Sequence, residues 1–395
     1  MDTRVKIILK SGKDQSVMRR HPWIFSGAIK KILGEPAEGD LVDVYNNKNE
    51  LLASGHYQPG SIAIRILSFE ALETDSAFWL SRIRSAYLYR KQTGLTGNPE
   101  TNVYRLVHAE GDNLPGLIID YYNGHAVIQM HSVGMYRNLD LIVKALKEIY
   151  GEKLVTIYNK SASTLPYKAE IERPENQFIL GDSDHAVVTE NSLKFEINWA
   201  KGQKTGFFID QRDNRELLQK YSEHRDVLNM FSYTGGFSVY ALAGKAKLVH
   251  SVDSSAKAIE QSDKNVGLNF RGAPHESFAQ DAFRFMENIR NKYDLIILDP
   301  PAFAKHQNVL HNALQGYKRL NQTALEQIRK GGFLFTFSCS QVVSKENFRK
   351  SVFAAAANAK RNVRILHQLT QPLDHPVNIY HPEGEYLKGL VLYVE

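Results

Sequence analysis

From about residue 190 onward the chain repeats one pattern, a short apolar run followed by a longer segment with helical spacing. The runs that lead to Asp299 and to Cys339 open as unbroken apolar stretches, which is typical of strands covered on both faces. We therefore predict an α/β domain with a mainly parallel, doubly wound sheet. The expected strands are Leu193–Trp199, Asp226–Met230, Leu248–Asp253, Glu276–Asp281, Leu295–Asp299, Phe333–Ser338, Arg364–Leu369 and Lys388–Val394, and the expected helices are Arg215–Tyr221, Val239–Ala243, Ala256–Phe270, Phe283–Asn291, Leu310–Lys330 and Asn347–Ala359.

The N-terminal part has a different pattern, in which short strand-like runs are separated by turn residues. Its expected strands are Val5–Leu9, Leu41–Tyr45, Leu51–Tyr57 and Ile62–Leu67. A helical segment, Thr74–Gln92, follows and leads into a mixed region. There the expected strands are Arg105–Ala109, Leu117–Tyr122, Ala126–Met130 and Leu154–Tyr158, with an amphipathic helix at Leu139–Ile149.

These patterns predict three domains. Residues 1–70 form a small β domain, residues 71–190 a linker helix and a central α/β domain, and residues 191–395 the doubly wound domain. In the central domain, His108, Asp112 and His131 are polar, but they lack the spacing of a catalytic set. We interpret them as residues of turns and hairpins, with substrate orientation as the alternative.

Composition adds three constraints. The chain has 395 residues, a formal net charge of +6 and one cysteine. A single cysteine excludes an internal disulfide and any zinc cage built from cysteines, and it fits a reducing, cytoplasmic location. The sequence has neither a signal peptide nor an apolar run of membrane-spanning length, so we expect no membrane partner and no metal.

Basic residues are concentrated at the N-terminus, where Arg4 to Lys31 contains eight of them and one acidic residue. Within this stretch Arg19 and Arg20 stand close to the aromatic residues Trp23 and Phe25. RNA sites combine cations for phosphate with flat rings for bases. From residue types alone, core packing of the aromatic residues is the simpler interpretation.

The segment that follows the strand Asp226–Met230 predicts a cofactor site. It carries aromatic residues and hydroxyls around a glycine turn, including Phe231, Tyr233 and Gly235. The G-x-G-x-x-G spacing that seats a pyrophosphate is absent. The turn therefore suits a ligand without phosphates, such as S-adenosylmethionine. Acids at successive strand ends would complete the site: Asp253 for the ribose hydroxyls, Asp281 for the adenine amino group, and Asp299.

Asp299 and Cys339 follow two apolar runs and could share one pocket beyond the carboxyl ends of the strands. A lone cysteine is more often a buried small hydrophobe. Here its position at a strand end, between Ser338 and Ser340, favours a nucleophile. A thiolate that adds to C6 of cytosine makes C5 nucleophilic toward a methyl donor, and Asp299 could hold the ring near N3 and the amino group.

The chain resembles the bacterial 23S rRNA large-subunit cytosine-C5 methyltransferases that carry an N-terminal PUA domain, over nearly its whole length. This resemblance implies a PUA barrel, a central α/β domain and a Rossmann-like methyltransferase domain, with Cys339 as nucleophile and 5-methylcytosine in 23S rRNA as product. It also implies that Arg19, Arg20 and Trp23 bind RNA, and it allows a homodimer. The motifs that carry it are Arg19-Arg20-His21-Pro22-Trp23-Ile24-Phe25-Ser26-Gly27, Thr205-Gly206-Phe207-Phe208-Ile209-Asp210-Gln211-Arg212, Phe231-Ser232-Tyr233-Thr234-Gly235-Gly236-Phe237, Asp299-Pro300-Pro301-Ala302-Phe303, Phe337-Ser338-Cys339-Ser340, Asp374-His375-Pro376, Pro382-Glu383-Gly384 and Tyr386-Leu387-Lys388-Gly389.

Two other functions remain open at this point. The sequence Asp299-Pro300-Pro301-Ala302-Phe303 is similar to the motif with which amino-methyltransferases hold an exocyclic amine, and in that case Cys339 would only pack. A non-catalytic RNA-binding assembly factor is the third candidate. Other RNA cytosine-C5 enzymes use a second cysteine for product release, which this chain lacks, so another base must act there.

Overall fold

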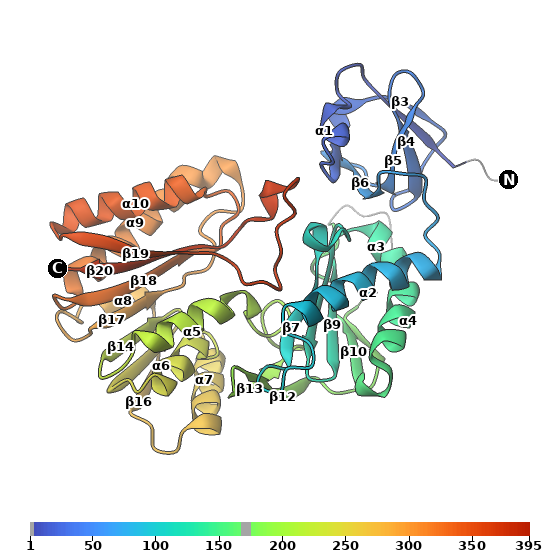
Figure 1. Ribbon diagram of the computed structural model, residues 1–395. Coiled ribbons are helices and arrows are strands. Elements are labelled where there is room, and N and C mark those ends of the chain that lie inside the picture. The colour runs from blue at the N-terminus through green and yellow to red at the C-terminus, as the bar shows by residue number, and fades with distance from the viewer. Residues whose placement is uncertain (1–3, 167–174) are drawn as a thin grey trace. The chain divides into compact units, whose positions relative to one another are not determined.

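The computed structural model describes residues 4–166 and 175–395 (Figure 1). The chain forms two compact units, each assembled from separate segments. The first unit contains the chain up to Ala186 together with Ile197–Gly206 and Leu373–Gly384. The second unit contains Val187–Glu196, Phe207–Pro372 and Glu385–Glu395. We keep the names first unit and second unit below.

The N-terminal part of the first unit is a six-stranded sheet with the order β2-β6-β5-β4-β1-β3. All neighbouring strands are antiparallel except β1 and β4, which run parallel. Alternate side chains of β4 and β5 enter a small apolar core that includes Ile7, Val42 and Ile64. The elements are β1 (Lys6–Leu9), α1 (Gln15–Met18), β2 (Trp23–Phe25), β3 (Ile29–Leu33), β4 (Leu41–Tyr45), β5 (Leu51–Tyr57) and β6 (Ile62–Ser68).

A five-stranded sheet of order β11-β10-β9-β8-β7 forms the rest of the first unit. Helix α2 begins after Asp75, whose side chain accepts a hydrogen bond from the backbone N–H of Phe78 and so caps the first turn. Trp79 and Ile83 of α2 pack into the same core as Leu106 and Ile142. The elements are α2 (Ser76–Gln92), β7 (Val103–His108), β8 (Leu117–Tyr122), β9 (His125–Met130), α3 (Val133–Arg137), α4 (Leu139–Tyr150), β10 (Thr156–Asn159) and β11 (Gln177–Leu180). The hairpin β12 (His185–Glu190) and β13 (Leu193–Asn198) contributes residues to both units.

The second unit is built on a seven-stranded sheet of order β16-β15-β14-β17-β18-β20-β19. The first five strands in this order are parallel, and β20 is antiparallel to both β18 and β19. Residues of β14 and β17 are buried. The unbroken apolar sequence of β17 predicts this, whereas β14 also contains Asp226 and Asn229. The strands are β14 (Asp226–Met230), β15 (Leu248–Asp253), β16 (His275–Ala279), β17 (Leu295–Leu298), β18 (Gly332–Ser338), β19 (Val363–Leu369) and β20 (Lys388–Val394).

Helices cover both faces of this sheet. Figure 1 shows α9 and α10 on one face and α5, α6 and α7 on the other. The core beneath α9 and α10 includes Tyr317, Leu320 and Phe348. The predicted class, a mainly parallel doubly wound sheet that follows a small β domain and a central α/β domain, is confirmed. The helices are α5 (Arg212–Lys220), α6 (Gly236–Ala243), α7 (Ala256–Asn269), α8 (Ala282–Met286), α9 (Leu310–Gln327) and α10 (Lys345–Ala359).

The bounds of several expected elements differ from the observed ones, and two of these differences lie next to the predicted cofactor site. The strand expected at Glu276–Asp281 is β16, which begins at His275 and already ends at Ala279. The helix expected at Phe283–Asn291 is α8, which begins at Ala282 and ends at Met286. The predicted domain boundaries remain a prediction.

The described part of the chain contains no candidate metal site and no candidate membrane-spanning helix. Across residues 4–166 and 175–395, no three His, Cys, Asp or Glu side chains are grouped so that they could hold a metal ion. Nor does any helix in those ranges have the length and apolar character that crossing a bilayer requires.

Candidate active site

The loop after β14 has an unusual backbone. Phe231 and Tyr233 have φ angles of 59° and 45°, and Gly235 has a φ of 79°. Left-handed conformations at bulky residues cost about 1–3 kcal/mol each and are typical of functional loops. Two hydrogen bonds hold this loop: the N–H of Tyr233 donates to Asp253 Oδ2 at 3.0 Å, and the N–H of Gly235 donates to the oxygen of Ser232 at 2.9 Å.

Gly235 is the position where the loop meets helix α7. A Cβ atom built on Gly235 would lie 2.3 Å from Oγ of Ser262. A side chain here would therefore clash in addition to being strained by the positive φ. The glycine allows the turn to approach α7 and leaves α6, which begins at Gly236, to start directly after it.

Asp253 ends β15 and is half-buried beside this loop. Its Oδ2 accepts from Tyr233, and its Oδ1 accepts from the N–H of Ser255 at 2.9 Å. These two bonds fix the plane of the carboxylate. Each carboxylate oxygen has two lone pairs, so both oxygens retain the capacity to accept from a pair of ligand hydroxyls.

Asp281 does not end a strand, contrary to our prediction. It is the N-cap of α8, and its Oδ1 accepts from the N–H of Arg284 at 3.0 Å. The chain leaves the sheet after Ala279 because Asp281 begins a helix instead. The carboxylate is exposed and can still accept from a ligand.

The structure brings together the two strand ends that carry Asp299 and Cys339, which are 40 positions apart in the sequence. Strands β17 and β18 are parallel neighbours, with Leu298 opposite Thr336. Beyond these ends, Sγ of Cys339 lies 3.9 Å from the backbone oxygen of Pro300. The hydroxyl of Ser340 donates to the backbone oxygen of Ala304. Both Asp299 and Cys339 are half-buried.

A buried carboxylate that the sequence analysis missed supports the cofactor loop from behind. Glu190, fully buried, accepts from Nε and Nη2 of Arg215 at 2.9 and 2.8 Å. Nη1 of Arg215 donates to the backbone oxygen of Phe208 at 2.8 Å, and the ring of Phe208 meets Tyr233 edge-on with centroids 5.2 Å apart. Glu190 therefore helps to hold the loop at Tyr233, because it binds Arg215, which in turn binds Phe208.

Comparison with known proteins identifies the family. A sequence profile described as S-adenosylmethionine-dependent methyltransferase matches residues 168–377, and one described as PUA-like domain matches residues 7–69. Ribosomal RNA large subunit methyltransferase I of Aeromonas salmonicida is 40% identical over 400 residues, covering 98% of this chain and 99% of its own. The Escherichia coli protein of that name is 36% identical, with 98% of each chain covered.

The chain belongs to the ribosomal RNA large subunit methyltransferase I family. Two solved structures share its fold at 22% identity, each covering 98% of this chain and 100% of the other. One is a SAM-dependent methyltransferase from Streptococcus mutans, with a TM-score of 0.83, and the other is a methyltransferase complexed with SAH, with a TM-score of 0.84. The predicted family, enzyme class and S-adenosylmethionine cofactor are confirmed.

The residues of this family member fit that cofactor. The loop of Phe231, Tyr233 and Gly235 offers backbone without a bulky side chain at its turn. Asp253 at the end of β15 and Asp281 at the start of α8 offer acceptor oxygens. Oγ of Ser232, in the middle of the loop, is buried and has no hydrogen-bond partner among the described residues. A buried hydroxyl of this kind can serve a ligand. Which of these groups touches the cofactor remains a prediction.

The N-terminal residues predicted to bind RNA differ in their surroundings. Arg19 and Arg20 are exposed, and Cζ of Arg20 lies 5.3 Å from the ring centroid of Phe69. Trp23 is already engaged within the first unit. Its Nε1 donates to Oε1 of Glu110 at 2.8 Å, and its ring centroid is 4.3 Å from that of His381. The two arginines are therefore the more accessible candidates for contact with phosphate.

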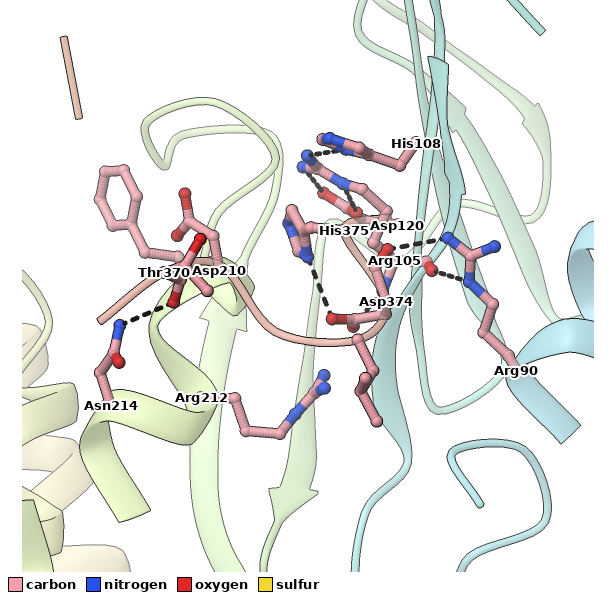
Figure 2. A network of polar contacts seen from close by, with 12 residues as sticks. Arg90, Arg105, His108, Asp120, Asp210, Arg212, Asn214, Thr370, Asp374 and His375 are labelled. Carbon is pink, nitrogen blue, oxygen red and sulfur yellow. Dashed lines mark hydrogen bonds and ion pairs between the residues drawn. The ribbon is translucent and has the colours of Figure 1, made fainter. Parts of the chain in front are cut away.

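The turn residues of the central domain belong to a buried polar network, part of which Figure 2 shows. Asp112 forms an ion pair with Arg90, whose side chain is fully buried. Arg105 donates to both oxygens of Asp120, at 2.7 and 2.9 Å. The backbone N–H of Arg105 donates to Asp374 at 2.9 Å. Asp112 thus lies in the turn between β7 and β8, as interpreted from the sequence, and its carboxylate also pairs with a buried arginine.

Proposed function

We propose that this protein transfers a methyl group to C5 of a cytosine in 23S rRNA, with Cys339 as the covalent nucleophile. The observation that carries this proposal is the contact of 3.9 Å between Sγ of Cys339 and the backbone oxygen of Pro300, next to Asp299. It sets a thiol and a carboxylate at adjoining ends of parallel strands, where ligands bind in open α/β sheets. The printed names of the relatives, ribosomal RNA large subunit methyltransferase I, support the substrate class.

The chemistry follows from these groups. The thiolate of Cys339 forms a bond to C6, and the electron pair of the C5–C6 double bond becomes available at C5. Bound S-adenosylmethionine would supply an electrophilic methyl group. C5 takes this group as the bond between the methyl carbon and sulfur breaks, which leaves S-adenosylhomocysteine. A base then removes the proton from C5, the C5–C6 double bond forms again, and the thiolate leaves. Asp299 holds the pyrimidine by its N3 and amino edge, which favours addition of the thiolate.

The packing of Phe303 supports C5 chemistry over methylation of an exocyclic amine. In an amino-methyltransferase the aromatic residue of this motif must be open to stack on a base. Here the ring of Phe303 packs on that of Tyr317, with centroids 4.6 Å apart, and against the core of the second unit. Phe303 is thus partly buried by packing, which leaves less of its ring to stack on a base, whereas Cys339 stands at the strand end.

The deciding experiment replaces Cys339 with Ala and measures transfer of labelled methyl groups to a 23S rRNA fragment. We expect transfer to fall by about 10³-fold or more, while binding of S-adenosylmethionine measured by calorimetry stays within about twofold. An RNA that carries 5-fluorocytosine should form a covalent adduct with the unaltered protein and none with Cys339→Ala. Retention of transfer by Cys339→Ala, with product at an exocyclic amine, would contradict the proposal.

A further inference from the structure

A lysine lies behind the segment that carries Cys339. Lys388 is the first residue of β20 and lies opposite Ser338, the last residue of β18. It is only 5% exposed. Its Nζ donates to the backbone oxygen of Ser340 at 2.5 Å and to that of Val343 at 2.6 Å. The ammonium group therefore joins the two ends of the turn that follows the cysteine.

This turn separates the end of β18 from the start of α10. The N–H of Val343 donates to the oxygen of Ser340 at 3.2 Å, so the turn also closes on itself. Ser344, the next residue, caps helix α10, which begins at Lys345. A movement of Ser340 and Val343 would displace Cys339 relative to Pro300, and Lys388 resists that movement with two hydrogen bonds.

Lys388 also brings a positive charge close to the thiol. Its two acceptors are carbonyl oxygens, which orient toward the charge without neutralising it. Burial lowers the pKa of Lys388 to about 8, while Cys339 and Glu385 raise it and Lys345 lowers it. Glu385 is itself in an ion pair with Lys345. The interaction between Lys388 and Cys339 is reciprocal, so the ammonium favours the thiolate form of the cysteine.

We propose that Lys388 is a positioning residue for the methyl transfer, which holds the turn after Cys339 and stabilises its thiolate through the buried ammonium charge. The effect on turnover rests on the function proposed above. The effect on the thiol does not, because it can be measured without catalysis.

Alkylation of thiols in this protein reports on Cys339 alone, because Cys339 is the only cysteine in the chain. We would follow alkylation of the whole protein by iodoacetamide, using intact mass, from about pH 6 to about pH 10, because only the thiolate reacts. Lys388→Met removes both charge and hydrogen bonds, and Lys388→Gln keeps amide donors without the charge. Lys345→Met is the control, because it removes an exposed lysine near the same turn.

For Lys388→Met we expect the midpoint of alkylation to rise by about one pH unit, and alkylation at pH 7.5 to slow roughly tenfold. Methyl transfer should fall at neutral pH and recover in part at higher pH, with binding of S-adenosylmethionine unchanged. If Lys388→Met does not fold, Lys388→Gln should show the same shift of the midpoint. Lys345→Met should leave the midpoint within about 0.3 unit.

An alkylation midpoint that does not move in a folded Lys388 variant overturns the inference, even if Cys339→Ala is inactive. A Cys339→Ala variant that retains methyl transfer contradicts the proposed function instead. It does not affect the conclusion from alkylation about how Lys388 acts on the thiol. The two failures can therefore be told apart.

Discussion

The carboxylate of Glu190 and the guanidinium of Arg215 form a bidentate pair in the core of the second unit, with hydrogen bonds of 2.9 and 2.8 Å. Tyr240 donates to the same carboxylate at 3.0 Å. Because Arg215 also holds the backbone oxygen of Phe208, this pair connects the core to the wall of the cofactor loop.

Glu190→Gln should therefore destabilise the second unit by about 3 kcal/mol or more, since it leaves a buried guanidinium without its charge partner. Urea unfolding followed by circular dichroism measures this change. Glu216→Gln is the matched control on α5, because Glu216 pairs with Lys220 at the surface and such pairs contribute about 0–1 kcal/mol. Equal losses in the two variants would contradict the structural role of Glu190.

Gly235→Ala should weaken binding of S-adenosylmethionine roughly tenfold or more, because the new Cβ would meet Oγ of Ser262 at 2.3 Å and φ is positive. Calorimetry with the cofactor provides the measurement. Gly267→Ala is the control, since nothing lies within 4 Å of a Cβ built there, inside helix α7. That change should leave binding unaltered and stabilise the helix by up to about 1 kcal/mol.

The two interpretations of Asp281, helix cap and adenine acceptor, can be separated by Asp281→Ser. Serine is as good an N-cap as aspartate, so stability should change by less than about 0.5 kcal/mol. If the carboxylate also accepts from the adenine amino group, the dissociation constant of S-adenosylmethionine should rise roughly tenfold. We expect this rise in the dissociation constant. Unchanged binding would leave Asp281 as a cap alone.

Acid should destabilise the first unit through His56. Burial, with help from Arg137 and Arg65, lowers the pKa of His56 to about 4. The unfolded chain binds a proton below about pH 6.5, whereas the folded unit resists it until about pH 4, so stability is lost as the pH falls through this window. The loss between pH 7 and pH 5 should be about 2 kcal/mol.

Tryptophan fluorescence reports this transition selectively, because Trp23, Trp79 and Trp199 all lie in the first unit. His56→Leu should reduce the dependence on pH without abolishing it, because burial also lowers the pKa of His131, in the same unit, to about 4. His224→Leu, at an exposed position, is the control. A variant His56→Leu with the full acid sensitivity of the parent would show that another group is responsible.

Arg19 and Arg20 should contribute to RNA affinity without sequence preference. Replacing both with Ala should reduce the slope of log K against log salt by about 2, one for each lost phosphate contact. Filter binding with a 23S rRNA fragment over a range of salt gives the slope. Lys91→Ala removes an exposed cation from α2 and should leave the slope unaltered if binding is localised at the N-terminal sheet.

Part of this architecture could be predicted because it depends on local signals. The runs at β17 and β18 are largely apolar and buried, so the residues that follow them, Asp299 and Cys339, could be placed from sequence. Strands β2 and β3 were not predicted. Strand β2 has only three residues, and in β3 intermediate and exposed positions follow one another irregularly. Neither strand therefore shows the two-residue alternation by which a strand is recognised in sequence.

The partners of buried charges could not be predicted for a different reason. Glu190 is 25 positions from Arg215, and Lys388 is 48 positions from Ser340. A single charged residue looks the same in sequence whether it is solvated or buried. Only the register of the sheet, such as Ser338 opposite Lys388, determines which backbone groups it reaches.

The segment Leu373–Gly384 belongs to the first unit although it follows most of the second unit in the sequence. Asp374 supplies acceptors to the backbone N–H of Arg105, at 2.9 Å, and to Nη2 of Arg90, at 2.8 Å. During synthesis the ribosome makes this segment after Phe207–Pro372, which forms most of the second unit. The interior of the first unit is therefore completed only after that part of the second unit has been made, and a polypeptide that stops before Leu373 would leave the buried Arg90 without one of its acceptors.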